Sequence, residues 1–170
     1  MQLKSTKSKS GNPWFYAHRP NATNVVIVLP ATEEEVLFLV EERPPLQAEN
    51  KGKFCIGTCA GLVGDVRDND TIENAAIQEL FEEAGLVAEN IKIVCNSVAS
   101  SAGCVSETST IVIANIKNKN QVRTPVDDGG VIVDRVWVRK DNIFHWLRQK
   151  EEEGYVLTSQ VLAAPLYLYE

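Results

Sequence analysis

The chain has 170 residues, of which 44% are hydrophobic and 24% charged, so it is long and apolar enough for one globular domain with a buried core. Its net charge of −6 and pI near 5.0 argue against a nucleic-acid-binding surface. No apolar run approaches the roughly 18 residues of a membrane span, and the polar N-terminus lacks the apolar stretch of a signal peptide, so we expect a cytoplasmic protein without membrane contact.

The first eleven residues differ in character from the rest of the chain. They carry Lys4, Lys7 and Lys9 without any acid, so we expect a flexible basic tail over residues 1–11. The rest of the chain contains no internal repeat, low-complexity block or long linker rich in proline, glycine or serine. We therefore expect a single domain over residues 12–170.

Short apolar runs rich in β-branched residues recur along this domain and predict strands. They occupy residues 24–30, 35–42, 90–99, 109–116 and 133–138. Several of these runs follow one another without room for a crossover helix. The sheet is therefore expected to be mixed, and the sequence does not give the order of its strands.

The best helix candidate covers residues 71–84. Asp70 is the predicted N-cap, Glu73 completes a capping box, and Gly85 ends the helix. A core-facing stripe follows from the spacing of Ile72, Ala76 and Leu80. Weaker patterns predict helices over 141–150 and near 158–168, the latter interrupted at Pro165. Strands interleaved with these helices indicate an α/β fold.

Three glutamates, at positions 79, 82 and 83, crowd the C-terminal end of the 71–84 helix. Like charges at this spacing repel one another, and the helix dipole already makes that end negative. Mg²⁺ or Mn²⁺ held by carboxylate oxygens would offset the repulsion. A solvated acidic face is the alternative, but an uncompensated break of local rules is typical of a functional site.

The cysteines and histidines suggest no other metal chemistry. The four cysteines, at positions 55, 59, 95 and 104, form no CxxC pair, and the two histidines, His18 and His145, are far apart in sequence. The sequence therefore indicates neither a zinc site nor a disulfide framework.

The segment QELFEEAGL, residues 78–86, resembles the second half of the sequence box of the Nudix hydrolases. That box runs Gly, five residues, Glu, seven residues, then Arg-Glu-apolar-x-Glu-Glu-x-Gly-apolar. Gln78 replaces the arginine, and Asp70 replaces the first glutamate; the two can keep a hydrogen bond. For the opening glycine, Gly64 keeps the spacing, whereas Gly61 fits the usual Ala-Gly-apolar context with three inserted residues. We prefer Gly61.

The resemblance extends beyond the box. VEERPPL (40–46) is similar to a segment before the box in ADP-ribose and nucleotide-sugar pyrophosphatases, and FCIGTCAGL (54–62) looks like the strand leading into it. SSAGCVSE (100–107) is similar to the Ser-Pro-Gly-x-x-x-Ser-Glu stretch after the box. There Ala102 replaces the proline that marks ADP-ribose enzymes, and CAGLVGD leans toward the UDP-sugar branch. The implied fold is a Nudix-type α/β/α sandwich with a mixed β-sheet.

The resemblance also implies roles for the acids. Glu79 and Glu83 would hold Mg²⁺ (or Mn²⁺), with Glu82 sharing or bridging and the backbone carbonyl of Ala60 as a further ligand. Gly61 matters because a residue without Cβ lets the loop pass close to metal and phosphate. These groups would neutralise a diphosphate and align a water for attack.

Further candidates come from segments outside the box. The general base is either a box glutamate, Glu82 or Glu83, or an acid of the PVDDGG loop (125–130), Asp127 or Asp128. The candidate substrate-binding residues are Arg43 for a phosphate, Glu107 on the substrate or metal side, and Trp14 or Phe15 for stacking a base. Each has an ordinary structural alternative as a surface or packed side chain.

The resemblance predicts a metal-dependent pyrophosphatase that cuts a nucleoside-diphosphate sugar, of the ADP-ribose or UDP-glucose type, into a nucleoside monophosphate and a sugar phosphate. The alternative is a sensor with a Nudix fold that binds a nucleotide-sugar without turnover, as the changes at Asp70 and Gln78 suggest. A third reading is a coincidental acidic helix in a structural protein. Relatives of this branch pair through their N-terminal segments, so a homodimer is expected.

Overall fold

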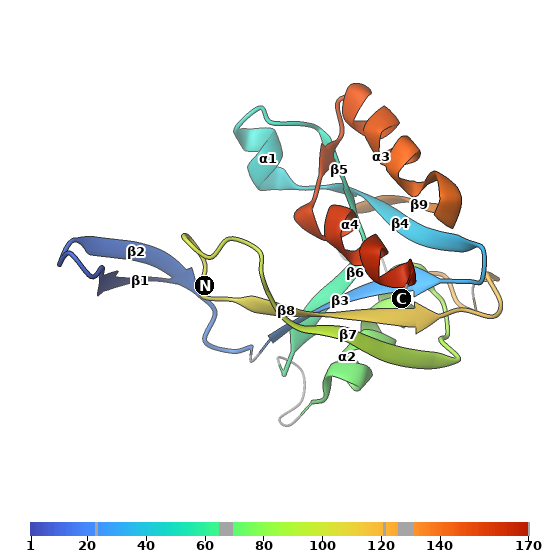
Figure 1. Cartoon of the computed structure of the whole chain (residues 1–170), viewed down its shortest axis with the longest axis horizontal. Helices are drawn as coiled ribbons and strands as arrows, with labels where there is room; N and C mark the ends of the chain where they lie inside the picture. The colour runs from blue at the N-terminus through green and yellow to red at the C-terminus, as the bar shows by residue number, and fades with distance from the viewer. Residues whose placement is uncertain (23, 65–69, 121, 126–130, 170) are drawn as a thin grey trace.

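The structure is a computed structural model of the whole chain, and it describes every residue except 23, 65–69, 121, 126–130 and 170. A mixed sheet of eight strands, counted within the described residues, forms its centre (Figure 1). Its strands are β3 (Asn24–Ala31), β4 (Glu35–Glu42), β5 (Phe54–Gly57), β6 (Cys59–Val63), β7 (Asn90–Ala99), β8 (Thr108–Asn115), β9 (Ile132–Arg139) and β10 (Val156–Leu157). The five strands predicted from sequence are confirmed.

Helices cover both faces of the sheet, with α2 on one face and α3 and α4 on the other (Figure 1). The helices are α1 (Pro44–Ala48), α2 (Ile72–Glu79), α3 (Ile143–Glu152) and α4 (Ser159–Ala163), with the π-helix η1 (Leu80–Ala84) and the 3-10 helices η2 (Lys140–Asn142) and η3 (Ala164–Tyr169). The α/β class with a mixed sheet is therefore confirmed. None of the helices in the described part of the chain is long and apolar enough to cross a membrane.

The sheet divides where β3 and β4 separate. In the described residues these strands meet at one rung, Ala31 opposite Val36. Beyond that rung β6 pairs with β3, whereas β9 and β5 pair with β4. The connection from β5 to β6 crosses between the two halves at Thr58, whose hydroxyl donates to the carbonyl oxygen of Val28 at 2.5 Å. The first residues of β6 are thereby fixed at the point where the halves separate.

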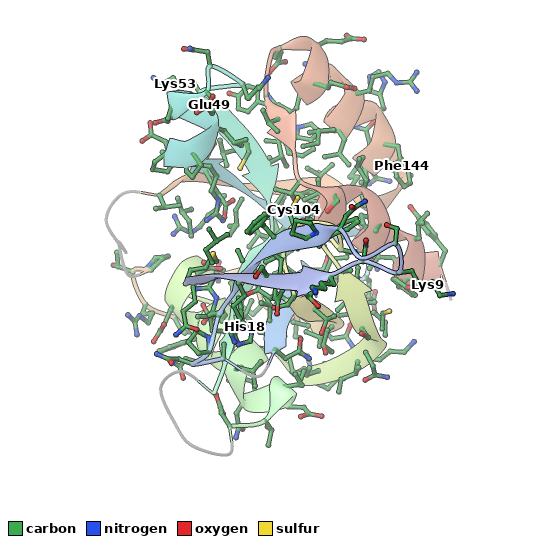
Figure 2. The ribbon with its side chains drawn as sticks, turned by 90° about the vertical axis from the view of Figure 1, so that its left-hand side faces the viewer. Lys9, His18, Glu49, Lys53, Cys104 and Phe144 are labelled. Carbon is green, nitrogen blue, oxygen red and sulfur yellow. The ribbon has the colours of Figure 1, made fainter. Side chains whose placement is uncertain are left out.

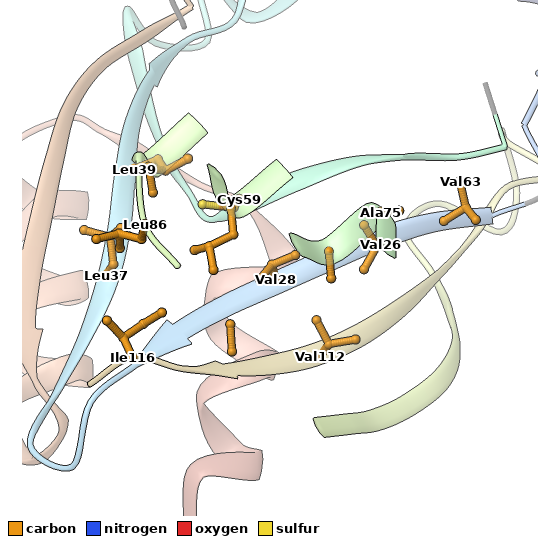
Figure 3. Packing of buried hydrophobic residues seen from close by; sticks show 14 residues of the cluster. Val26, Val28, Leu37, Leu39, Cys59, Val63, Ala75, Leu86, Val112 and Ile116 are labelled. Atoms are coloured by element: carbon orange, nitrogen blue, oxygen red, sulfur yellow. The ribbon is translucent and has the colours of Figure 1, made fainter. Parts of the chain in front are cut away.

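Two hydrophobic cores lie on the two faces of the sheet. Alternation along β4 sends Leu37 and Leu39 into the core beneath α2, and Phe38 into the core beneath α3 and α4. Figure 3 shows the first core, in which Val26 of β3 lies beside Ala75 of α2, and Leu37 of β4 lies beside Leu86. Because helices cover both faces, β3 and β4 are almost continuously apolar, which made them recognisable in the sequence.

Helix α2 packs as its sequence pattern predicts, with Ala76 and Leu80 fully buried. Its N-cap, however, is Thr71, whose hydroxyl accepts the backbone N–H of Asn74 at 3.2 Å. Asp70 instead accepts the N–H of Thr71 at 3.0 Å, so the predicted cap is wrong by one residue. The predicted end is correct, because Gly85 has a φ of 69°, in the left-handed region that glycine adopts without strain.

The N-terminal residues form a hairpin where the sequence suggested a tail. Strand β1 (Gln2–Lys7) pairs antiparallel with β2 (Pro13–His18), and all β1 side chains are exposed. A lysine-rich segment thus stays solvated while its backbone is paired, a possibility that composition alone does not reveal. The hairpin is attached to the loop before β8, because Ala17 N–H donates to Cys104 O at 2.8 Å and Ser106 N–H donates to Ala17 O at 3.1 Å. Figure 2 views the molecule from this side, with His18 and Cys104 labelled.

The cap of α2 gives a test of the helix boundary. Replacing Thr71 with alanine removes the acceptor for the Asn74 N–H, so we expect the free energy of unfolding to fall by about 1 kcal/mol. Thr71→Ser keeps a hydroxyl and should retain most of the stability. Urea unfolding of both variants and the wild type measures the difference. Equal stability of Thr71→Ala and wild type would contradict this cap assignment.

Candidate active site

The acid-bearing end of α2 lies directly against β6. The carboxylate of Glu79 occupies the space beside Gly61, where an added Cβ would come within 1.8 Å of Glu79 Oε1. Only glycine permits this approach of a helix side chain to a strand backbone. Gly64, the other candidate for the box glycine, has a φ of 86° and serves as a turn residue after β6. The geometry favours Gly61 as the box glycine.

Glu83 reaches the neighbouring residue of the same strand. Its Oε2 accepts the backbone N–H of Ala60 at 2.9 Å. The backbone carbonyl of Glu83 accepts from Nε of Arg135 on β9 at 2.5 Å. A cation therefore stands at the negative end of the helix, where it offsets part of the dipole and of the acidic charge.

The third acid has a different partner. Gln78 Nε2 donates to Glu82 Oε1 at 3.4 Å, one turn further along. Gln78 therefore contacts Glu82, and Asp70 contacts the backbone of Thr71, in place of the Asp70–Gln78 hydrogen bond that the sequence allowed. The turn that carries Glu82 and Glu83 is the π-helix η1. Such wide turns occur often at functional sites because they redirect side chains.

Buried thiols lie beneath these acids. The pKa of Cys59 is raised well above its usual value, first because the thiol is fully buried and then because Glu83, Glu41 and Glu79 disfavour a nearby thiolate. Burial, followed by Glu41, raises the pKa of Cys55 to about 11. Both thiols therefore stay neutral at physiological pH. The charge of Glu41 on β4 contributes to both pKa shifts.

The remaining candidate residues lie in three other places. Arg43 donates from Nε and Nη2 to Glu41 Oε2, at 3.1 and 2.8 Å. Glu107 accepts from Arg19 Nε at 3.0 Å, at the base of the hairpin. Trp14 is on the hairpin and donates from Nε1 to the Gly103 carbonyl at 2.7 Å. These contacts fix the three side chains against their protein partners.

Asp127 and Asp128, the candidate bases of the PVDDGG loop (125–130), lie outside the described residues. Of the predicted site residues, Glu79 and Glu83 both contact β6: Glu79 lies beside Gly61, and Glu83 accepts the N–H of Ala60. Glu82 faces Gln78, and Trp14 lies on a separate element.

The comparison with protein families agrees with this geometry. The family model of the NUDIX domain matches residues 18–159, which is most of the chain and includes all three helix acids. The chain belongs to the Nudix family. It is therefore a hydrolase that acts on phosphorus anhydrides, and the family membership that the sequence box predicted is confirmed.

Solved structures support the Nudix fold independently. The chain is similar to the crystal structure of an ADP compounds hydrolase, with a TM-score of 0.64 and 16% sequence identity, over 86% of this chain and 73% of the other. At that identity the likeness concerns the fold. None of the curated protein sequences compared matches the chain.

The donor set of this Nudix site fits a hard divalent cation in its chemistry. Nudix hydrolases generally use such ions, and carboxylates with a backbone carbonyl are the oxygen ligands that Mg²⁺ prefers. The described residues nevertheless contain no group of three or more His, Cys, Asp or Glu side chains already arranged around an ion. Glu83 accepts the Ala60 N–H through Oε2 and Glu82 accepts from Gln78 through Oε1. A carboxylate has two oxygens that each accept more than one contact, so these bonds are compatible with binding a cation.

Two charged residues near the Nudix acids were not selected from the sequence. Glu41 is 1% exposed, and its place two residues after Leu39 puts it on the buried face of β4 beneath α2. The alternation along this strand could have identified Glu41 from the sequence, because a charged residue at a core-facing position needs a partner. Arg135 had no comparable signal, because its contact with Glu83 depends on how β9 pairs with β4.

The contact between Glu79 and Gly61 gives a test of the Nudix site. Gly61→Ala would force the Glu79 carboxylate away from β6, so we expect hydrolytic activity to fall about a hundredfold while the protein still folds. The control is Gly154→Ala after α3: its φ of 90° makes the change strained, but the new Cβ would meet nothing within 4 Å, so activity should be retained. Steady-state kinetics and circular dichroism on both variants make the comparison. Full activity in Gly61→Ala would contradict this placement of Glu79.

The cysteines give a second test, based on burial. Iodoacetamide at about pH 8 should modify the exposed Cys104 in the folded protein and leave Cys55 and Cys59 unmodified, because buried neutral thiols react poorly. All should react in denaturant. Peptide mass spectrometry identifies the modified positions. Labelling of Cys59 at the rate of Cys104 in the native protein would contradict the packing under α2.

Proposed function

We propose that the protein hydrolyses the pyrophosphate bond of a nucleoside-diphosphate sugar, of the ADP-ribose or UDP-glucose type, to a nucleoside monophosphate and a sugar phosphate. The observation that carries the proposal is the convergence of Glu79 and Glu83 on two consecutive residues of β6, Ala60 and Gly61. Negative charge is concentrated there, because Gly61 has no Cβ and lets one carboxylate approach the strand while Ala60 N–H binds the other. A diphosphate cannot bind at such a concentration of negative charge without cations.

Mg²⁺ or Mn²⁺ would be held by Glu79, Glu83, Glu82 and the carbonyl of Ala60. When bound, such an ion neutralises phosphate oxygens and makes a nearby water more acidic. The residues of the chain fix the geometry: α2 packs its Ala76–Leu80 stripe on the sheet, and this presents the acids to β6. Arg135 holds the last turn of the acidic helix in place through the Glu83 carbonyl.

Hydrolysis requires a base that takes the proton from the attacking water. The water oxygen forms the new bond to one phosphorus, the bond from that phosphorus to the bridging oxygen breaks, and the other phosphate leaves. We assign the base role to Asp128 or to one of the box acids, Glu82 and Glu83. Val131, the first described residue after Asp128, pairs with the end of β4, because Glu42 N–H donates to Val131 O at 2.6 Å.

The substrate class rests on the segments around the box. Arg43 carries a guanidinium suited to a phosphate, and its hydrogen bonds to Glu41 come from Nε and Nη2. Glu107 and Trp14 are the further substrate-side candidates. The similar solved structure is described as an ADP compounds hydrolase, which agrees with a nucleoside-diphosphate compound as substrate. The sequence features at Ala102 and CAGLVGD favour a UDP-sugar over ADP-ribose.

We also propose that two copies of the chain pair through the N-terminal hairpin. Leu3 and Phe15 are 79% and 62% exposed. Their register puts them on the same face, because Leu3 lies opposite Ala17 and Ser5 lies opposite Phe15. An exposed leucine and phenylalanine on one face of a two-stranded sheet offer apolar surface to a second copy.

A substrate panel tests the function. Incubation with ADP-ribose, UDP-glucose, GDP-mannose and dinucleoside polyphosphates plus Mg²⁺, followed by phosphatase and a phosphate assay, should reveal turnover of a nucleotide-sugar that EDTA abolishes. Glu83→Gln should lower kcat about a hundredfold or more, because the amide cannot hold a cation as a carboxylate does. The matched control, Glu73→Gln, changes an exposed acid at the opposite end of α2 and should retain activity.

Two outcomes would overturn the proposal. Hydrolysis that persists unchanged in Glu83→Gln would contradict the role of the acid cluster. Saturable binding of a nucleotide-sugar without products, measured by calorimetry, would indicate the sensor alternative, in which the Nudix fold binds its ligand without turnover.

A further inference from the structure

Glu41 is a buried carboxylate that the roles assigned above do not use. Its side chain is 2% exposed, although it stands only two residues from Arg43 at the end of β4. Burial of a carboxylate is strongly unfavourable unless partners compensate it. A hydrophobic residue would continue the pattern of Leu37 and Leu39 at no such cost. The charge at this position therefore needs a reason beyond packing.

The strand directs Glu41 toward the catalytic helix. Leu37 and Leu39 enter the core beneath α2, and Glu41 continues the same period of two. The pairing of β4 with β9 is irregular at this point, but the extra residue, Val133, lies on β9, so the alternation along β4 continues to Glu41. On the neighbouring strand β5, Cys55 lies opposite Glu41 and Gly57 lies opposite Leu39, so Glu41 shares the face of Leu39, which carries the helix acids.

Three neighbours hold the Glu41 carboxylate. Cys55, directly opposite on β5, brings its Sγ to 3.5 Å from Oε2. Gly57 provides space, because an added Cβ there would come within 2.5 Å of Oε2. Arg43 donates two hydrogen bonds to that same oxygen. All of these contacts involve Oε2, so they fix the position of the Glu41 carboxylate. The carboxylate in turn fixes the guanidinium of Arg43.

Arg43 is the only one of these partners with a large exposed surface. Its side chain is 47% exposed, against 2% for that of Glu41. The pair is therefore anchored at its buried end and open at its guanidinium end. Pro44 and Pro45 follow at once and restrict the backbone. An arginine fixed in this way needs little further ordering to meet an anion.

We propose that Glu41 is a positioning residue that fixes the guanidinium of Arg43 for the diphosphate of the substrate. The inference rests on the proposed function, because it assigns Arg43 to the substrate of that site. Glu41 itself does not touch the substrate. Gly57 contributes to this positioning, because it provides the space that the carboxylate occupies.

The test compares Glu41→Gln, Arg43→Lys and the double variant. Glu41→Gln keeps the shape but loses the charge, so KM for the best substrate of the panel should rise about tenfold while kcat changes by less than about twofold. Arg43→Lys should give a similar rise. The double variant should be no worse than the poorer single variant, because both changes remove the same contact. Glu42→Gln, an equal charge change one residue along, should leave KM unchanged.

Binding and stability measurements separate the possible failures. Titration of inorganic pyrophosphate with Mg²⁺, followed by calorimetry, should show the same weakening of about tenfold in Glu41→Gln as KM does. If Glu41→Gln only lowers the melting temperature, with KM and pyrophosphate affinity unchanged, Glu41 has a structural role and the inference is wrong. Additive effects in the double variant would also overturn it. Absence of turnover in the wild type overturns the proposed function itself, and this inference with it.

Discussion

The approach of two helix carboxylates to the backbone of one strand is the constraint on which the site depends. Glu79 fills the space that a side chain at Gly61 would need, and Glu83 accepts the N–H of Ala60. Like charges at the negative end of a helix repel one another and the helix dipole. The fold opposes this repulsion with Arg135, which donates to the Glu83 carbonyl from a strand far away in sequence.

The divided sheet is what makes room for this arrangement. Because β3 and β4 meet at Ala31 and Val36 and then take different partners, the start of β6 lies between the two halves. The acids of α2 reach β6 from one side, and Glu41 of β4 lies on that same face. The core under α2, with Ala76 and Leu80 fully buried, fixes the helix against the sheet. Residues from both halves of the sheet can therefore face one substrate.

Much of the fold could be predicted, and the errors have identifiable causes. Strands buried on both faces, such as β3 and β4, are nearly continuous apolar runs and were found. The hairpin was missed because all β1 side chains are exposed, so the segment has no apolar pattern, and its backbone pairing does not depend on one. The N-cap was misplaced by one residue because Asp70 and Thr71 are both residue types that cap helices well. The backbone path before the helix decides between them, and it brings the Thr71 hydroxyl to the N–H of Asn74.

The sequence by itself determined the family and the identity of the helix acids, because the second half of the box lies within α2 and η1, where its spacing is local. It also determined the end of that helix, since Gly85 alone fits its backbone conformation. The tertiary structure decided which glycine the acids meet, which cation compensates them, and that Arg43 is held by a buried Glu41. Each of these depends on how β4, β6 and β9 lie relative to α2, and strand pairing between distant segments leaves no local pattern in a single sequence.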